Sequence, residues 1–257
     1  MSWFARLLIV MALLPASLAA ADSTIAAAPA AETSPSVSRV LVPVLALGQP
    51  GANGSVWDTQ LWVCNTADEP IVYYFGSCSV ACCCDEINTY PPQGTQLVEL
   101  IQPHGQWFEF PASGFLQIHA RFRDRSRESL SAGVELPVVR TDDFSSGELN
   151  FIGIPRNSSF RVMLRLYSLE AGVTVWIDQI DHFGRLIRQD SAYLDPPGPA
   201  DVGGIPAYAQ IAFAPSTTED APLRLRATSL RPETRFWGFV SVTNNETSAV
   251  TIIQPSR

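Results

Sequence analysis

The residues best suited to chemistry are the five cysteines, which all lie in one short stretch of the chain. They are Cys64, Cys78 and the run Cys82-Cys83-Cys84. In an exported protein such cysteines usually form disulfides, and an odd number leaves one thiol free or paired with another chain. The alternative is a metal site. Adjacent cysteines match the spaced ligand pairs of tetrahedral zinc poorly and suit soft Cu(I) better, with Cys78, Cys82 and Cys84 as the ligands.

The expected strands restrict how these cysteines pair. If residues 57–65 and 70–77 form a hairpin, Cys64 and Cys78 lie ~20 Å apart at a rise of about 3.3 Å per residue. That separation exceeds the ~7 Å limit on the Cα–Cα distance of a disulfide. We therefore expect no Cys64–Cys78 bond, and a bridge from Cys78 into the run 82–84 instead.

Aromatic side chains offer a second chemistry, because exposed rings on a β-sandwich can stack on sugar rings. The competing role for each ring is packing in the core or between strands. Trp62 is the best candidate for a ligand-stacking ring. Trp57, Trp176 and Trp237 recur at equivalent positions of an internal repeat, which favours packing. The aromatic residues considered for stacking are Trp57, Trp62, Tyr73, Tyr74, Trp107, Trp176 and Trp237.

No combination of residues indicates an enzyme. The histidines, His104, His119 and His182, are scattered and form no metal-binding motif. All 17 basic residues are arginines, and the absence of lysine excludes Schiff-base catalysis. Nothing in the sequence brings together the carboxylates that could pair as glycosidase acids. These carboxylates are Glu99, Glu109, Asp178 and Asp181. We predict a non-enzymatic protein without a cofactor.

The N-terminus has the plan of a secretory signal peptide, predicted over residues 1–20. Its apolar run, residues 7–14, is too short to span a bilayer, so no transmembrane anchor is expected after cleavage. Residues 21–38 are rich in Ala, Ser, Thr and Pro and predict a flexible lead. We expect export to the periplasm or the cell exterior. A formal charge of -8 argues against nucleic-acid partners and leaves a protein or glycan at the cell surface.

A repeated pattern predicts the fold. An aromatic-led segment, 57–65, is followed by an acidic turn and an apolar segment, 71–75. The same order recurs at 160–168 and 173–177. Each pair has the pattern of a β-hairpin, and a fixed-period repeat predicts a duplicated unit. Two further matches extend the repeat: 116–120 with 223–227, and 131–136 with 237–242.

The repeat divides the chain into two predicted β-sandwiches, 39–142 with the Cys-rich segment and 147–257. Strands are expected near 57–65, 70–77, 95–101, 106–110, 115–122, 131–139, 149–154, 160–168, 172–180, 185–190, 208–214, 222–229, 235–243 and 248–254. In the first of these, Leu61 and Val63 should point inward. The residues expected to point outward are Asp58, Gln60, Trp62 and Cys64.

The turn-rich segment 50–61, the segment 65–70 and the ending 239–245 with 252–255 resemble a known group. These are exported, largely uncharacterised bacterial proteins built from tandem Ig-like β-sandwich modules. The resemblance covers most of 40–257 and implies fold and export, without catalytic residues. The expected function is structural, adhesive or ligand-binding. The alternatives are carbohydrate binding through exposed aromatics, and thiol or copper binding through residues 78–84.

Overall fold

The computed structural model describes residues 37–51, 54–74, 87–99, 101–111, 116–127, 132–196, 204–215 and 221–256. Every pairing between the described strands is antiparallel, which confirms the all-β prediction. These residues belong to one compact unit, Pro35–Arg257. The predicted signal peptide, nearly all of the flexible lead, Cys78 and the run 82–84 lie outside the described residues.

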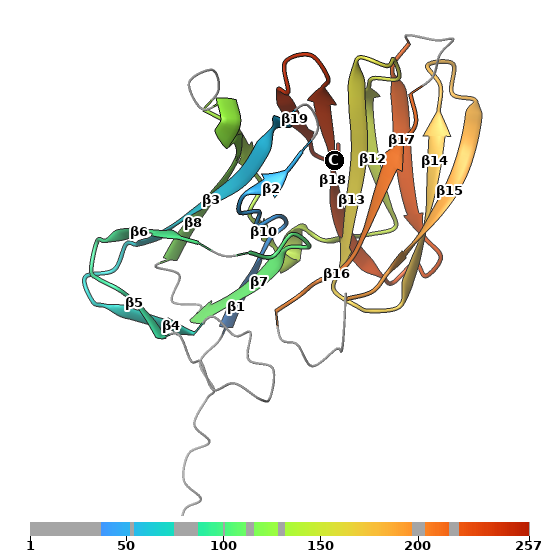
Figure 1. Cartoon of the computed structure of the whole chain (residues 1–257). Helices are drawn as coiled ribbons and strands as arrows, with labels where there is room; N and C mark the ends of the chain where they lie inside the picture. The colour runs from blue at the N-terminus through green and yellow to red at the C-terminus, as the bar shows by residue number, and fades with distance from the viewer. Residues whose placement is uncertain are drawn as a thin grey trace, which may run out of the picture. The chain divides into compact units, whose positions relative to one another are not determined.

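The first half forms three small sheets (Figure 1). The largest has the order β2-β3-β8-β9, and β6 pairs with β3 further along the edge that β2 occupies. The second has the order β10-β1-β7, and the third pairs β4 with β5. The strands are β1 (Val37–Val42), β2 (Gln49–Pro50), β3 (Val56–Asn65), β4 (Ile71–Tyr74), β5 (Ile87–Tyr90), β6 (Thr95–Val98), β7 (Gln106–Pro111), β8 (Leu116–Asp124), β9 (Val134–Leu136) and β10 (Val139–Arg140).

The predicted hairpin between residues 57–65 and 70–77 is wrong, because β3 pairs with β6 and β8 while β4 pairs with β5. Asn65 explains the difference. Its fully buried side-chain amide donates to the carbonyl oxygens of Glu69 (2.8 Å) and Tyr90 (3.1 Å), and its Oδ1 accepts from Ala67 N. These bonds fix a corner that takes the chain out of the sheet of β3.

The second half is a two-sheet sandwich. One sheet has the order β11-β18-β13-β16 with β19 beside β18, and the other has the order β12-β17-β14-β15. The predicted 160–168 and 173–177 hairpin is therefore also wrong, since β13 and β14 lie in different sheets. The strands are β11 (Ser145–Ser146), β12 (Glu148–Ile154), β13 (Phe160–Ser168), β14 (Val173–Ile180), β15 (Leu186–Leu194), β16 (Ala207–Phe213), β17 (Leu223–Ser229), β18 (Arg235–Asn244) and β19 (Val250–Ile253).

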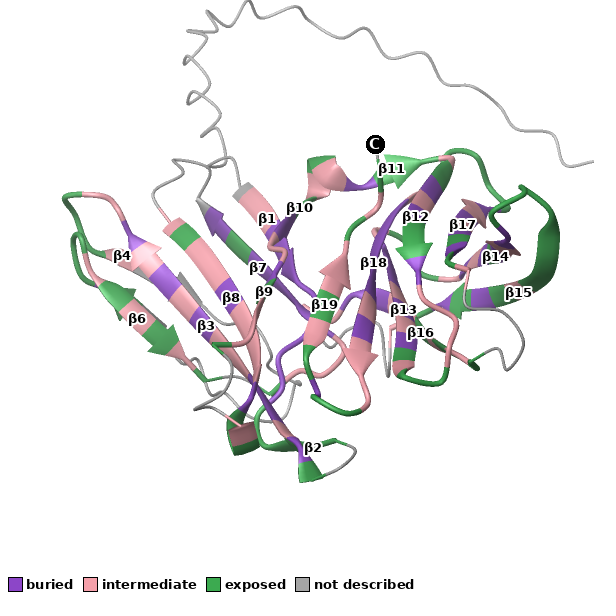
Figure 2. Ribbon diagram, turned by 90° about the horizontal axis from the view of Figure 1, so that it is seen from above, coloured by how far each residue is buried: buried purple, intermediate pink, exposed green. Residues whose placement is uncertain are grey.

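Alternating apolar residues fill the space between these two sheets. Phe151, Leu164 and Ile177 are fully buried there, as the period of two along their strands requires. Strand β18 differs, because five successive residues of it, 236–240, are buried (Figure 2). Both faces of β18 are therefore covered.

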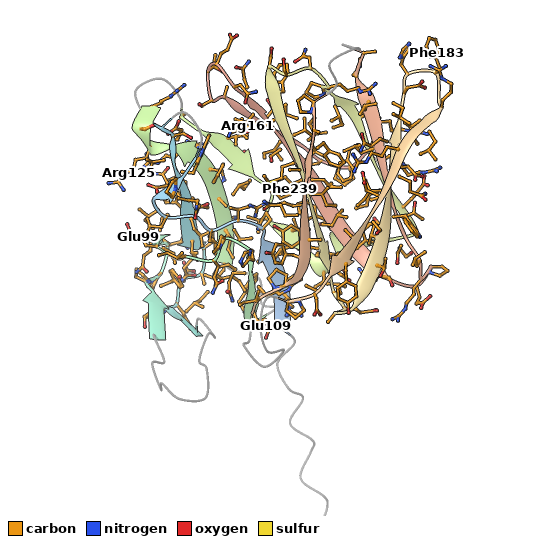
Figure 3. All side chains as sticks on the ribbon, turned by 45° about the vertical axis from the view of Figure 1, so that its right-hand side comes forward. Glu99, Glu109, Arg125, Arg161, Phe183 and Phe239 are labelled. Atoms are coloured by element: carbon orange, nitrogen blue, oxygen red, sulfur yellow. The ribbon has the colours of Figure 1, made fainter. Side chains whose placement is uncertain are left out.

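The first half covers the second face of β13 and β18. Tyr167, Trp237 and Phe239 pack into the same core as Leu41, Val63 and other residues of the first half, and Phe239 lies between the halves in Figure 3. The Tyr167 hydroxyl donates to the carbonyl oxygen of Pro43, and Arg165 Nη1 donates to that of Pro103 at 2.7 Å. The two halves therefore share one core.

Two short 3₁₀ helices complete the described structure, η2 (Arg125–Arg127) and η3 (Thr141–Asp143). The second lies where the predicted first sandwich ends, at residue 142. Arg235 of β18 holds it, because its Nη2 donates to Thr141 O at 2.5 Å and its Nε donates to Phe144 O at 3.2 Å.

Two of the predicted repeat matches join strands with different partners. Residues 116–120 lie in β8, which pairs with β3, but residues 223–227 lie in β17, which pairs with β14. Residues 134–136 form β9 at a sheet edge, whereas 237–242 lie in the central strand β18. Neither match therefore joins strands with equivalent partners, because alternation alone does not identify a strand's neighbours.

Candidate functional site

Trp62 lies on the outer face of the sheet β6-β3-β8-β9. Leu61 and Val63 are buried on the inner face, as expected, and Trp62 between them is only half-buried. Its register partners are Leu97 of β6 and His119 of β8. The Trp62 and His119 ring centroids lie 5.7 Å apart with the planes tilted by 38°. Leu97 is 51 % exposed, so this part of the face is open to solvent.

Charged side chains border the Trp62 ring. The Arg121 guanidinium carbon lies 6.0 Å from the ring centroid, within reach of a cation–π interaction. His119 Nδ1 lies 3.5 Å from Glu135 Oε1, and Arg121 stands opposite Glu135 in the register of β8 and β9. We name Trp62, Leu97, His119, Arg121 and Glu135 the Trp62 platform. It joins an aromatic surface to hydrogen-bond donors and acceptors.

Two other residues expected on this face have structural roles. Gln60 faces Arg123, and with its amide turned so that the oxygen faces the guanidinium, the N···O distances are 3.1 and 3.2 Å. Asp58 is only 6 % exposed, unlike an outward-facing strand residue. Its Oδ1 accepts from Gly48 N at 2.6 Å, and Oδ2 lies 3.8 Å from Arg125 Nη1. The contact with Gly48 accounts for its burial.

Cys64 is a half-buried free thiol on the same face as Trp62, two residues further along β3. Its register partners are Thr95 and Gln117. The other cysteines lie outside the described residues. Within the described ranges, no group of three or more His, Cys, Asp or Glu side chains is placed to hold a metal ion.

Trp176 is more exposed than the sequence analysis expected. It is 38 % exposed on the outer face of β14, and Tyr193 of the neighbouring strand β15 is 61 % exposed. The alternation of 173–177 could have revealed this, because Val173, Val175 and Ile177 point inward and direct Trp176 outward. The remaining tryptophans of the described residues, Trp57, Trp107 and Trp237, are buried. The side chains of Tyr73 and Tyr74 are not described.

A charged network lies beside Trp176 on the same sheet. Arg226 donates two hydrogen bonds to Asp178 Oδ2, at 2.5 and 3.1 Å, and Gln189 donates to Oδ1 at 2.7 Å. Burial raises the pKa of Asp178, but the hydrogen bonds from Arg226 and Gln189 outweigh it, so its pKa lies below the ordinary value. This carboxylate is therefore held as an anion that fixes Arg226.

Three of the four carboxylates considered as glycosidase acids, Glu109, Asp178 and Asp181, have arginine or backbone partners. Glu109 pairs with Arg39 at 3.1 Å, and Glu99 lies apart from it (Figure 3). Asp181 accepts from the backbone amide of Phe183 at 2.9 Å and stabilises the turn after β14. The His104 ring stacks on Tyr208 with centroids 4.5 Å apart. Burial lowers the pKa of His104, and the charge of Arg165 lowers it further.

Comparisons with protein-family models, with curated proteins and with solved structures find no match to this chain. Among the described residues, the structure contains no helix long and apolar enough to cross a membrane. The geometry of the faces described above is thus the basis for a functional assignment.

Proposed function

We propose that this chain is an exported, non-enzymatic β-sandwich protein that binds carbohydrate at the cell surface or in the periplasm through the Trp62 platform. The observation that carries the proposal is a half-buried, outward-facing tryptophan ring bordered by both donors and acceptors. The C–H groups of a sugar ring pack on the electron-rich face of an indole. Its hydroxyls then donate to Glu135 and accept from Arg121 at the border of the ring.

The electrostatics of the platform favour a neutral ligand. Arg121 and Glu135 bring opposite charges to the same face, and His119 lies 3.5 Å from Glu135. A strongly charged polymer would meet a repulsive partner on this face, whereas hydroxyl groups can satisfy both kinds of side chain. The outer face of the sheet also suits an extended glycan, because successive outward side chains of β3 and β8 lie in rows.

The exposed Trp176 and Tyr193 offer a second surface for the same chemistry. Asp178, Gln189 and Arg226 lie in the same sheet and present fixed polar groups. This surface supports a glycan-binding role for the second half as well. The copper alternative has less support, since its ligands Cys78, Cys82 and Cys84 lie outside the described residues.

Internal duplication is part of this proposal, and strand pairing supports it better than the sequence matches. The order β6-β3-β8-β9 in the first half corresponds to β16-β13-β18-β19 in the second. Likewise β1 pairs with β7 as β12 pairs with β17, and β4 pairs with β5 as β14 pairs with β15.

The second half is like an immunoglobulin domain in having two packed sheets, but the two differ in strand order. In an immunoglobulin domain the first two strands lie in one sheet. In the second half, the long strands β12 and β13 lie in different sheets. We therefore propose tandem sandwiches of a related Greek-key type, with 39–142 and 147–257 as the duplicated segments.

A glycan array tests the carbohydrate proposal. The purified chain should bind a subset of glycans, and Trp62→Ala should lose that binding while keeping the β-sheet circular dichroism of the wild type. Phe183→Ala is the matched control, since it removes an aromatic ring that is 70 % exposed and belongs to neither proposed surface. No glycan above background for the wild type would exclude carbohydrate binding.

A further inference from the structure

A pocket lies between the sheet that contains β3 and β8 and the turn that joins β18 to β19. It is separate from the Trp62 platform. It has a volume of about 470 Å³, within the usual range for small-ligand sites. One wall comes from β3, β8 and η2, and the opposite wall comes from the turn between β18 and β19, residues 246–249. Trp57 of β3 and Asp124 of β8 are register partners. Both lie on the face of the sheet that carries Leu61 and Val63, opposite to Trp62.

The first wall of the pocket is aromatic. The rings of Trp57 and Phe122 are stacked with centroids 4.8 Å apart and planes 6° from parallel. Trp57 Nε1 donates to Ser55 Oγ at 3.0 Å, which fixes the indole. The pair gives the pocket a rigid apolar surface.

Asp124 contributes a buried carboxylate whose two oxygens differ. Oδ1 accepts from Val56 N at 3.1 Å, from Ser126 N at 3.0 Å and from Ser126 Oγ at 2.6 Å. Oδ2 is buried and accepts no hydrogen bond within the described structure. Its nearest charged partner is Arg127 Nε at 3.7 Å, which is beyond hydrogen-bond distance. The acceptor capacity of Oδ2 therefore remains unused.

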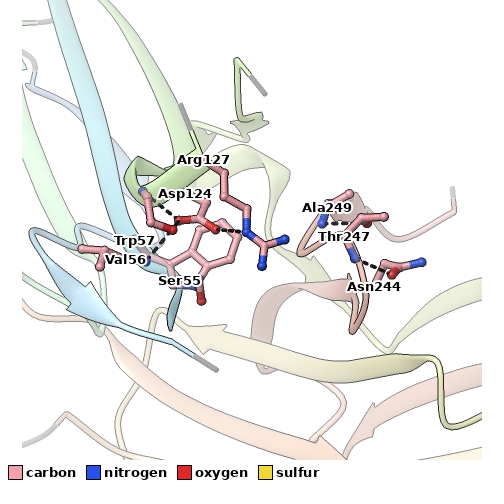
Figure 4. Close-up of polar contacts among 9 residues, drawn as sticks. Ser55, Val56, Trp57, Asp124, Arg127, Asn244, Thr247 and Ala249 are labelled. Atoms are coloured by element: carbon pink, nitrogen blue, oxygen red, sulfur yellow. Dashed lines mark hydrogen bonds and ion pairs between the residues drawn. The ribbon is translucent and has the colours of Figure 1, made fainter. Parts of the chain in front are cut away.

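The opposite wall has a second unsatisfied group. Ser248 is 4 % exposed and its Oγ has no hydrogen-bond partner within the described structure. Its backbone is held at φ 57°, in the left-handed region that few non-glycine residues adopt. In Figure 4 the guanidinium of Arg127 projects from Asp124 toward the turn with Thr247 and Ala249.

We propose that this pocket binds one neutral sugar residue, packed on the Trp57–Phe122 wall and held by Arg127, Asp124 and Ser248. A hydroxyl inserted between Arg127 and Asp124, after a small movement of the arginine, accepts from the first and donates to the second. Such a bridge replaces a contact too long for a hydrogen bond by two charge-assisted hydrogen bonds. Ser248 Oγ gains a partner from a further hydroxyl.

The charges of the pocket exclude the other simple ligands. Its charged side chains are Asp124, Arg127 and Glu246, so the net charge is negative and an anion is disfavoured. The Asp124 carboxylate also repels an anion, and a cation cannot accept a hydrogen bond from Arg127. A hydroxyl group accepts from Arg127 and donates to Asp124. This inference rests on residues outside the Trp62 platform and stands independently of it.

Isothermal titration calorimetry of the purified chain tests the pocket with a panel of glucose, galactose, mannose, rhamnose and N-acetylglucosamine, and with inorganic phosphate. We expect at least one of these sugars to bind and phosphate not to bind. Arg127→Gln and Ser248→Gly should each weaken binding about tenfold, equivalent to about 1.4 kcal/mol. Ser248→Gly removes the hydroxyl while suiting the positive φ, so the turn should stay folded.

Two controls separate this site from its surroundings. Arg125→Gln changes a neighbouring arginine that pairs with Asp58 and does not line the pocket. Trp62→Ala removes only the platform, and neither change should alter monosaccharide affinity. The pocket proposal is overturned if no sugar binds, if phosphate binds instead, or if Arg127→Gln and Ser248→Gly bind like the wild type. None of these outcomes would bear on glycan-array binding that depends on Trp62, so the pocket and the Trp62 platform are tested separately.

Discussion

Removal of one hydroxyl group, in Tyr167→Phe, tests whether the two halves of the chain stabilise each other. The Tyr167 ring is fully buried in the shared core, and burial raises the pKa of its phenol. Its hydroxyl donates to the carbonyl oxygen of Pro43, 124 residues earlier in the chain. Phenylalanine keeps the ring and its packing, so the substitution removes only the hydroxyl and its contacts with Pro43 and Arg165.

The expected cost follows from the burial of both partners. A buried hydrogen bond contributes about 0.5–1.5 kcal/mol, and a buried group left without its partner costs about 1–3 kcal/mol. We expect the free energy of unfolding to fall by about 2 kcal/mol, which lowers the Tm by roughly 4–8 °C for a unit of this size.

Denaturant unfolding followed by tryptophan fluorescence and circular dichroism measures this effect. Tyr193→Phe is the control, because Tyr193 is 61 % exposed and its hydroxyl loss should change stability little. The wild type should unfold in a single transition seen equally by both probes, since the halves share a core. Two separate transitions, or a Tyr167→Phe effect no larger than that of Tyr193→Phe, would refute the shared core.

Two further substitutions test the second half. Phe151→Ala leaves a cavity at a fully buried position between the two sheets of this half. It should lower the free energy of unfolding, measured in urea, by about 3–5 kcal/mol. A loss smaller than that of an exposed-site control such as Ile152→Ala would contradict the core assignment. Arg226 and Gln189 hold the pKa of Asp178 below its ordinary value. The stabilising effect of this carboxylate is therefore complete above the unfolded-state pKa of about 3.9, and it is lost as the pH falls through the lower folded-state pKa. Asp178→Asn should therefore be less stable than the wild type at neutral pH and show a smaller loss of stability in acid; parallel pH profiles would rule out this contribution.

Side-chain alternation was enough to predict the strands and many of their faces. Leu61 and Val63 are buried and Trp62 is turned outward, as a period of two requires. The predicted segments of the second half coincide with β12 to β19 to within a few residues. These features depend on local sequence alone, which explains why they could be predicted.

Strand pairing depends on long-range contacts and could not be predicted in the same way. The corner at Asn65 requires the carbonyl oxygen of Tyr90, and only the folded chain brings that oxygen close. The outer face of β13 also has an ordinary pattern in sequence, and its burial depends on contacts such as Arg165 with Pro103. Asp58 was expected outside and is buried, because Gly48 supplies the amide that its carboxylate needs.

Titration of wild type, Trp62→Ala and Trp62→Tyr with the best glycan from the array tests the Trp62 platform most directly. Calorimetry should show an affinity loss of at least about tenfold for Trp62→Ala, equivalent to about 1.4 kcal/mol. Trp62→Tyr should retain part of the affinity, because it keeps an aromatic face. Equal affinity of Trp62→Ala and the wild type would contradict glycan binding at this face.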